Sequence, residues 1–339
     1  MNDGFTHSDK YSAYVDKLSD DPKVTLRKAL EFINWEKYIR KNSTVFVKPN
    51  FTFPYYKEGI TTSPQLIKSL LEIIKERTNN VILGESNGGN HSFTAEKAFE
   101  GHGMYKICKE VGVKLVNLSN LPWKYVESKI QSKTVKVQLP RLLLEKINCF
   151  ISLPVLKVHV MTGVSLSMKN LWGCYPDTMR CLHHQNFSHK LVLIAKLLKP
   201  KIVVVDGTYA LDKHGPMYGE AVKTSLILTA NNPVVADTLG AMILGIPLKR
   251  AKHILVAEKE GIGTTNLQEV RINNNWRKFR RQFQIKKTLI DRASTLFFYS
   301  DKLARFVMDS PATPLIYKVA SILRSPEEKE VVSQIGKHY

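Results

Sequence analysis

The side chains best suited to chemistry lie in residues 157–174, which read KVHVMTGVSLSMKNLWGC. This stretch places Lys157, His159 and Lys169 near one another, with Asn170 directly after the second lysine. Two ammonium groups would balance the charge of an anionic ligand, and a lysine in a cleft can titrate low enough to act as a base or nucleophile. An imidazole titrates near working pH. We therefore predict His159, Lys169 and Lys157 as catalytic residues, with Asn170 orienting the ligand.

Polar side chains also end the apolar runs that we predict as strands. The runs VFVKPN, VILGES, FISLPVLKVH and IVVVDG close on polar groups, namely Lys48 and Asn50, Glu85 and Ser86, Lys157 and His159, and Asp206. Ligands of open α/β sheets bind outside the carboxyl ends of the strands. We therefore predict one shared cleft, whose ligand-binding residues are Lys48, Asn50, Glu85, Ser86, Asn170, Gly207 and Gly215.

Imidazole and carboxylate groups in the same regions suggest a metal such as iron, nickel or zinc. The run HHQNFSH contains His184, and the loop DGTYALDKHGPMYGE holds Asp206 and Asp212, which we expect to lie close together. Asp237 interrupts the apolar run PVVADTLGAMIL, where a charge requires a partner. The candidate ligands of a divalent metal are His159, His184, Asp206 and Asp237.

The segments that must position these groups alternate between strand-like and helix-like patterns. Short β-branched runs are typical of buried strands, and apolar residues at helical spacing indicate helices between them. This alternation predicts an α/β fold, with a mostly parallel sheet flanked by helices and the cleft at the carboxyl ends of its strands. The expected strands are 44–48, 81–86, 113–118, 147–157, 201–207 and 224–230, and the expected helices are 62–78, 94–110, 187–198 and 232–245.

The chain divides by composition near residue 270. Residues 1–270 carry the α/β pattern, which could form two lobes near 1–130 and 131–270. Residues 271–339 are basic with interspersed apolar residues, and we predict amphipathic helices appended to the body. Phe279, Phe283, Leu289, Phe297 and Phe298 of this extension could enter an anionic membrane surface or pack on the body, and both alternatives stay open.

Composition restricts the classes of function. Of the 339 residues, 43% are hydrophobic and 24% charged, and the formal net charge of +20 attracts polyanions. No nucleic-acid reading module is present, so we do not expect specific nucleic-acid binding. The four cysteines form no CxxC pair, so an iron–sulfur cluster is not expected in this chain. The N-terminus MNDGFTHSDK lacks an apolar signal region, which predicts a cytoplasmic protein, with membrane association through the extension as an alternative.

Several segments also carry a resemblance to a known family. VFVKPN, TTSPQLIKSLLE, VILGESNGG, INCFISLPVLKVHVMTGVSLSMKNLWGCYP, LHHQNFSH, IVVVDGTYALDKHGPMYGE, LILTANNPVVADTLGAMILGI and AEKEGIG occur in that order. Over Val45 to Gly263 the chain resembles the domain-of-unknown-function family 362, which sometimes occurs in iron–sulfur proteins. The family often has Glu-Gly before its Gly-Pro loop. This chain has Asp212 and Lys213 there, and it also lacks a cluster-binding cysteine module.

A second likeness concerns pattern alone. The residues His159, Gly163, Ser165, Lys169, Gly173 and Pro176 are similar in order to a stretch of the nickel-pincer lactate racemase family. In that family the lysine tethers a nickel-bearing pyridinium cofactor, and histidines bind metal or move protons.

Three functional hypotheses follow from these observations. The first is an enzyme, or a metal- or anion-dependent protein, that binds an anionic small molecule in the predicted cleft. The second is a peripheral membrane protein that acts on, or scaffolds, anionic lipid or lipid-linked glycan. The third is a non-specific polyanion binder.

The structural alternative for Lys169 and Asn170 is a helix start that satisfies backbone groups.

Overall fold

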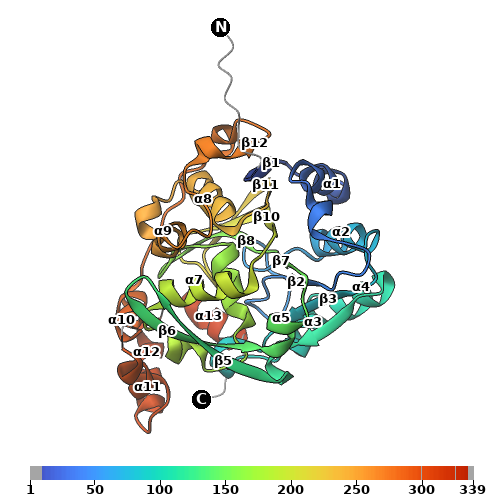
Figure 1. Ribbon diagram of the computed structural model, residues 1–339. Coiled ribbons are helices and arrows are strands. Elements are labelled where there is room, and N and C mark those ends of the chain that lie inside the picture. Colours follow the sequence, from blue (N-terminus) through green and yellow to red (C-terminus); the bar gives the residue numbers. More distant parts are fainter. Residues whose placement is uncertain (1–9, 299, 325, 335–339) are drawn as a thin grey trace.

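The computed structural model describes residues 10–298, 300–324 and 326–334 (Figure 1). The stretch in which we predicted no signal region therefore lies almost wholly outside the described residues. One sheet has the order β12-β1-β11-β10-β7-β2-β3-β4, with β8 paired to β10 and β9 paired to β8. Its strands are β1 (Ser12–Lys17), β2 (Val45–Lys48), β3 (Val81–Glu85), β4 (Lys114–Asn117), β7 (Cys149–Ser152), β8 (Val155–His159), β9 (Gly163–Ser165), β10 (Ile202–Asp212), β11 (Glu220–Ala230) and β12 (Arg271–Ile272). A separate hairpin pairs β5 (Trp123–Ile130) with β6 (Lys133–Pro140).

The centre of the sheet is parallel and buried on both faces. β4, β3, β2, β7 and β10 run parallel in that order, so their carboxyl ends meet at one edge. In β2, Val45 and Val47 join one hydrophobic cluster while Phe46 joins the cluster on the opposite face. Because both faces are covered, these strands are continuously apolar rather than alternating. The prediction of a mostly parallel α/β sheet is confirmed.

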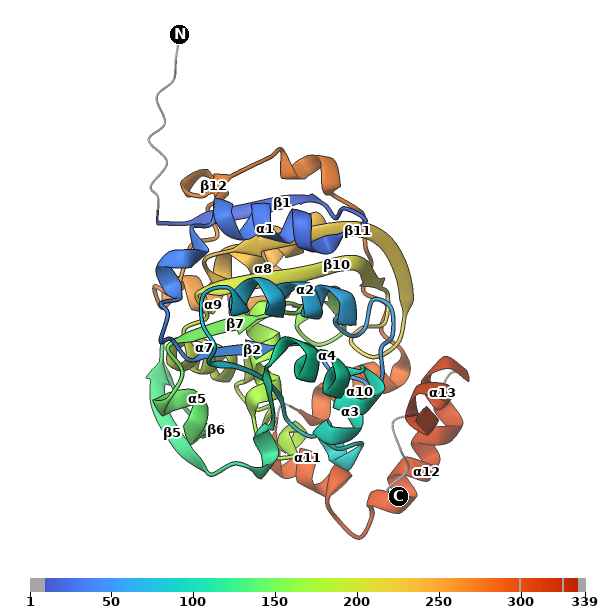
Figure 2. The same cartoon turned by 90° about the vertical axis from the view of Figure 1, so that its right-hand side faces the viewer.

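Helices cover both faces of this sheet (Figures 1 and 2). One face packs against α1 (Pro22–Phe32), α2 (Pro64–Lys75), α3 (Ala95–Gly101) and α4 (Met104–Val111). The opposite face packs against α5 (Arg141–Glu145), α6 (Ser167–Asn170), α7 (Phe187–Leu198), α8 (Pro233–Ile243) and α9 (Lys252–Lys259). The sheet draws strands from both sides of residue 130, and it is continuous across the two lobes that the sequence suggested.

Three local predictions differ from the structure. The helix expected over 94–110 is two helices, because Gly103 takes a positive φ of 69° between α3 and α4. The strand expected over 147–157 breaks into β7 and β8 around Leu153 and Pro154. The loop expected from Asp206 starts only after Asp212, because β10 continues to that residue while pairing with β11. Asp206 and Asp212 are therefore six positions apart on an extended strand, about 20 Å, and do not share a site.

The C-terminal extension first crosses the body and then forms helices. Phe283 is buried, and Phe279 and Ile285 pack against the core, so this part is anchored to the α/β body. The helices α10 (Leu289–Phe297), α11 (Asp301–Met308), α12 (Thr313–Leu323) and α13 (Pro326–Gln334) follow. They lie along one side of the molecule, and α12 and α13 stand away from the sheet in Figure 2. The prediction of appended helices is confirmed from Leu289 onward.

Candidate functional site

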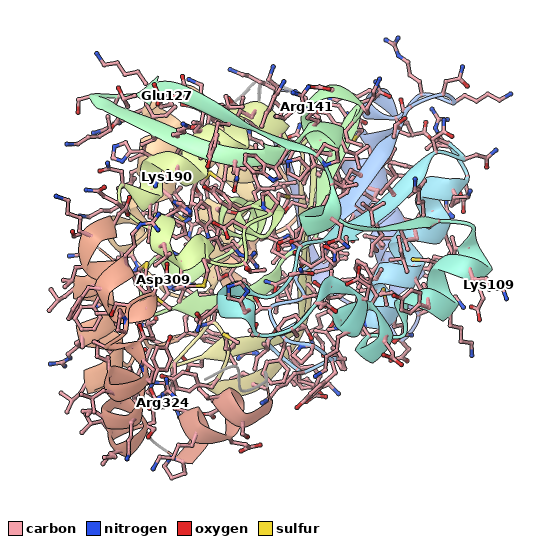
Figure 3. The ribbon with its side chains drawn as sticks, turned by 90° about the horizontal axis from the view of Figure 1, so that it is seen from below. Lys109, Glu127, Arg141, Lys190, Asp309 and Arg324 are labelled. Atoms are coloured by element: carbon pink, nitrogen blue, oxygen red, sulfur yellow. The ribbon has the colours of Figure 1, made fainter. Side chains whose placement is uncertain are left out.

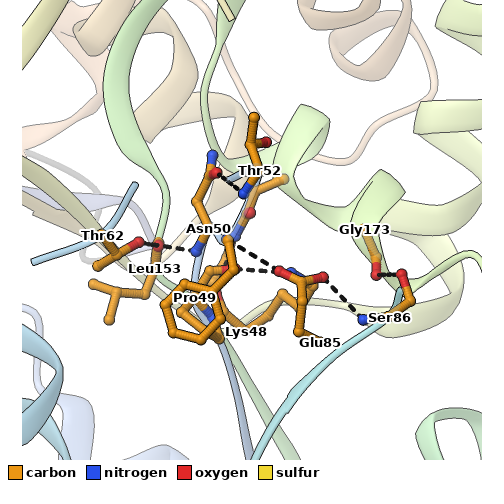
Figure 4. A network of polar contacts seen from close by, with 12 residues as sticks. Lys48, Pro49, Asn50, Thr52, Thr62, Glu85, Ser86, Leu153 and Gly173 are labelled. Atoms are coloured by element: carbon orange, nitrogen blue, oxygen red, sulfur yellow. Dashed lines mark hydrogen bonds and ion pairs between the residues drawn. The ribbon is translucent and has the colours of Figure 1, made fainter. Parts of the chain in front are cut away.

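The residues predicted at the strand ends form a closed set of contacts that we call the strand-end network: Lys48, Asn50, Glu85, Ser86, Ser152, Lys157 and Asn170. At its centre the Lys48 Nζ lies 2.5 Å from Glu85 Oε2 and donates to the Pro49 carbonyl at 2.8 Å (Figure 4). Lys48 is only 1% exposed. The parallel register of β2 and β3 brings their last residues to the same edge, which explains why the two charges meet.

The Glu85 carboxylate also accepts hydrogen bonds from backbone N–H groups. The Phe51 N–H donates to Oε2 at 3.1 Å and the Ser86 N–H donates to Oε1 at 3.0 Å. Gly173 covers the pair, because a Cβ at that position would lie 2.9 Å from both Lys48 Nζ and Glu85 Oε1. The Ser86 hydroxyl donates to the Gly173 carbonyl and holds this cover in place (Figure 4). The ion pair is thus sealed under the chain.

The polar groups of Asn170 and Lys157 also have their hydrogen-bond partners within the fold. The Asn170 amide donates to the Lys48 carbonyl at 3.0 Å and to the Ser152 hydroxyl at 3.3 Å. The Lys157 Nζ donates to the Ile60 carbonyl at 2.7 Å and lies 3.4 Å from Asn50 Oδ1. Burial, reinforced by the Lys169 charge, lowers the pKa of Lys157 well below its ordinary value. These side chains tie the loops at the strand ends to one another.

The two aspartates predicted as metal ligands accept backbone hydrogen bonds. Asp206 accepts from the N–H groups of Ser63 and Thr208, at 2.7 and 2.9 Å. Asp237 accepts from the N–H groups of Ser167 and Met168, at 2.7 and 3.0 Å, and so caps the start of α6. Burial raises the pKa of Asp237 to about 7. The buried charge at Asp237 has the partners that the sequence required, but they are peptide groups.

The predicted glycines pack against backbone. A Cβ on Gly207 would lie 2.7 Å from the Leu226 carbonyl oxygen, on the neighbouring strand β11. A Cβ on Gly215 would lie 2.0 Å from the Val158 carbonyl oxygen, on β8. Both positions allow close approach of chain segments within the fold.

Lys169 differs from every member of the strand-end network. Its Nζ makes no hydrogen bond to any residue that the structure describes, and it lies 5.4 Å from the centre of the Phe187 ring. Burial, together with the Arg180 charge, lowers the pKa of Lys169 to about 8. At pH 7 it is therefore still mostly an ammonium ion, with its donors unused.

Three histidines lie near enough to this ammonium group for its charge to lower their pKa values. Burial is the larger cause in each case: the pKa falls to about 3 for His184 and His253 and well below 6.5 for His159. All three imidazoles are therefore neutral at pH 7. Neither nitrogen of the fully buried His253 has a hydrogen-bond partner among the described residues. Its Nε2 lies 3.9 Å from Asp237 Oδ2, beyond hydrogen-bond distance.

The hydrogen bonds of the other two histidines fix where their protons lie. The Met161 N–H donates to His159 Nδ1 at 3.1 Å, so the proton of the neutral ring is on Nε2. His184 Nδ1 lies 2.6 Å from the Cys181 carbonyl, so that nitrogen carries the proton and Nε2 has a free lone pair. His159 thus offers a donor and His184 an acceptor.

A cavity of about 700 Å³, which we call the basic pocket, adjoins this cluster. The loop after His159, the start of α7, the start of α9 and helix α10 line it, and no aspartate or glutamate does. The start of α7 adds partial positive charge, and no side chain caps that helix. Its charged and titratable lining residues are His184, His189, Lys249, Arg250, Lys252, His253, Lys287 and Arg292.

A slightly larger cavity, of about 790 Å³, lies elsewhere, between the loop after β3 and the α11–α12 connection. Asn87, His91 and Asp309 are among its lining residues, and none of the predicted site residues is. The basic pocket is therefore the better candidate for the predicted chemistry.

The structure splits the predicted cleft into two places. It brings Lys48, Glu85 and Asn170 together in the strand-end network, and Lys169 together with His159 and His184 beside the basic pocket. Among the described residues, no three His, Cys, Asp or Glu side chains are arranged to hold a metal ion. The metal site stays a prediction without a supporting geometry.

Sequence reasoning missed His253 and the basic lining of the pocket. His253 sits in KHILVAEK, where its helical position gives no sign that both ring nitrogens lack partners. The basic cluster in residues 248–253, LKRAKH, was a visible signal of the lining. What the sequence does not show is that these cations face α7 and α10, far from them along the chain.

Comparison with known proteins agrees with the resemblance seen in the motifs. The model of the family described as "Domain of unknown function (DUF362)" matches residues 45–242. The chain is 21% identical over 236 residues to "Thylakoid-associated protein sll1697" of Synechocystis sp., covering 67% of this chain and 71% of that protein. Neither comparison bears on the likeness to the nickel-pincer family.

Proposed function

The chain belongs to the DUF362 family, whose description assigns no activity, and we propose that it binds the anionic group of a small substrate beside the basic pocket. In this proposal the Lys169 ammonium neutralises the anion. The His159 Nε2–H donates a hydrogen bond to the substrate, and the His184 Nε2 lone pair accepts one. The reaction class that these groups support is proton transfer on an anion-bearing molecule.

One observation carries the proposal. Lys169 is a partly buried cation that meets no acceptor among the described residues, and its charge acts on His184 and His253, which line a pocket that has no carboxylate in its lining. An ammonium group removed from water without a partner is costly, and an anionic ligand would supply the missing counter-charge. The unpartnered His253 adds two further nitrogens that a ligand or its water could satisfy.

The test compares two lysine variants by isothermal titration calorimetry with inorganic phosphate and sulfate. Lys169→Ala should weaken anion binding by about tenfold or more, because a charge-assisted hydrogen bond is lost. Its unfolding midpoint should fall little, because the removed cation has no hydrogen-bond or ion-pair partner among the described residues and only a ring contact with Phe187. The matched control is Lys201→Ala, an exposed lysine directly before β10. Equal affinities of wild type and Lys169→Ala would contradict the proposal, and equal losses in both variants would indicate binding by net charge alone.

A second candidate function is association with an anionic membrane surface. The net charge of +20 supports it, and a relative is named as thylakoid-associated. No helix in the described part of the chain is long and apolar enough to cross a bilayer, so the proposed association is peripheral. Arg292 and Thr295 of α10 line the basic pocket, so the C-terminal extension borders the proposed anion site. A substrate linked to a membrane lipid would therefore combine both candidate functions. Flotation with anionic but not with neutral vesicles is the expected result, and no flotation with either contradicts it.

A further inference from the structure

Exposed leucine, isoleucine and phenylalanine side chains are concentrated in one part of the described chain. Among the described residues, every strongly exposed leucine or isoleucine, and the one such phenylalanine, belongs to residues 289–323. In the described α/β body, the large hydrophobic side chains that are strongly exposed are Val24, three tyrosines and Trp123. Isolated exposed apolar residues are normal, but a concentration of this kind marks an interaction surface.

The exposed residues are spaced so that each helix presents them on one side. Leu315, Val319 and Ile322 of α12 follow an i, i+4, i+7 pattern, and they are 67%, 52% and 73% exposed. Leu303 and Phe306 of α11 are three residues apart. This spacing is that of an amphipathic helix whose apolar side has no partner.

The other sides of these helices are already used. On α11, Ala304 is buried against the body. On α12, Thr313 is buried, and the Tyr317 hydroxyl accepts from the Asn90 amide at 3.1 Å. Phe298, which directly follows α10, packs with its ring centre 4.7 Å from that of His184. The helices are therefore held by one side, and their exposed apolar residues lie away from these contacts.

The outward side also carries positive charge. Lys302 and Arg305 of α11 and Lys318 of α12 are exposed, whereas the exposed Arg292 of α10 lines the basic pocket. Asp309, at the end of α11, is the exposed carboxylate in this stretch of described residues. Apolar side chains flanked by cations match the interface of an anionic bilayer, where the first enter the acyl boundary and the second meet headgroups. A second copy of the chain fits less well, because a two-fold contact would set these cations against one another.

We propose that the outward side of α10, α11 and α12 is a docking surface for an anionic membrane, with the helices lying in the plane of the interface. The inference rests on the second candidate function and adds the surface that performs it. It also revises which residues are involved. Phe279, Phe283 and Phe298 pack toward the body, whereas Leu289 is 72% exposed and belongs to the docking surface.

The experiment uses the full chain, because Phe283 is buried and a deletion of the extension would uncover the core. Flotation is measured with vesicles of phosphatidylcholine alone and of phosphatidylcholine mixed with phosphatidylglycerol, at about 0.15 M salt. The double variant Leu315→Ser with Ile322→Ser should lower partitioning onto the mixed vesicles by about a hundredfold, roughly tenfold per side chain. The matched control is Val24→Ser with Tyr105→Ser, which removes exposed apolar residues of the body and should leave partitioning unchanged.

A second pair of variants tests the charges. Arg305→Gln with Lys318→Gln should weaken binding to the mixed vesicles by about thirtyfold. Lys106→Gln with Lys109→Gln changes two exposed lysines of α4 and should have a much smaller effect. Figure 3 places Lys109 on the opposite side of the molecule from Arg324.

The outcomes separate the two levels of the inference. Wild-type flotation that the α12 variant does not reduce would overturn the docking surface and leave a membrane function through another face. Failure of the wild type to float with either kind of vesicle would overturn both. Equal losses in the α4 and α11–α12 charge variants would also overturn the surface. The docking surface would also be overturned if light scattering showed wild-type dimers that dissociate in the α12 variant, while that variant still floats with vesicles.

Discussion

The strand-end network and the basic pocket are both rich in lysine, but they differ in what their ammonium groups contact. Lys48 and Lys157 donate to a carboxylate and to carbonyl groups within the fold. Lys169 donates to nothing that the structure describes, and the charged and titratable groups near it are the Arg180 cation and three neutral imidazoles. The first region is internally complete, whereas the second has an excess of donors and positive charge.

The difference shows that polar residues at strand ends can have opposite roles within a few residues of one another. Asn170 follows Lys169 directly, yet Asn170 fastens α6 to β2 while Lys169 stays unpaired. Hydrogen-bond satisfaction separates the two roles where residue type does not. On this criterion the network stabilises the fold, and the pocket is the place where we propose that a ligand binds.

The largest effect expected from this comparison is on stability. Glu85→Gln would leave the Lys48 charge buried without its counter-ion, and we expect the free energy of unfolding to fall by about 3–5 kcal/mol. Urea unfolding followed by circular dichroism measures it. The control is Glu127→Gln on the exposed hairpin, expected within about 0.5 kcal/mol of wild type. A loss no greater than that of the control would show that the network is not closed as described.

A smaller loss is expected from Gly173→Ala. The added methyl group would lie 2.9 Å from both Lys48 Nζ and Glu85 Oε1, which must then shift. We expect about 1–3 kcal/mol of destabilisation, as for overpacking in a well-packed interior. Gly89→Ala is the matched control, because the nearest atom to its Cβ would be 4.0 Å away. If Gly173→Ala is as stable as this control, the cover over the ion pair is loose and a ligand could enter there.

The smallest effect concerns the rim of the basic pocket. Lys249 is an exposed cation of the lining, so Lys249→Gln should weaken sulfate binding only about two- to fivefold. The effect should shrink further at high ionic strength, because exposed charges are screened. Calorimetric affinities at two salt concentrations test this. A loss as large as that of Lys169→Ala would move the binding site from the buried cation to the rim.

Much of the fold could be predicted from the sequence because its signals are local. The runs VFVK and CFIS are apolar at every position before their last, as strands covered on both faces must be. The helix over Phe187–Leu198 matches its predicted bounds. The hairpin β5–β6 was not predicted, because its strand WKYVESKI mixes lysine and serine with apolar residues and half faces solvent.

The site was harder to predict because its side chains contact residues that are distant in the sequence. We expected Lys48 and Glu85 at one edge of the sheet. Only the structure shows that their charged groups form an ion pair with each other. Asp237 needed a partner, and the sequence offered no means of choosing two peptide N–H groups of α6 over a metal. Lys169 was singled out by its position, and the structure adds that it lacks an acceptor.

Proton uptake on anion binding tests the central distinction most directly. The pKa of free Lys169 is about 8, and a bound anion would raise it by stabilising the charged form. At about pH 8, sulfate binding should therefore take up about half a proton, measured by calorimetry in buffers of different ionisation enthalpy. Affinity should decline as the pH rises above this value, where the free amine loses its charge. The account predicts that this uptake disappears in Lys169→Ala. Sulfate binding to the wild type without proton uptake, or undiminished uptake in Lys169→Ala, would contradict it.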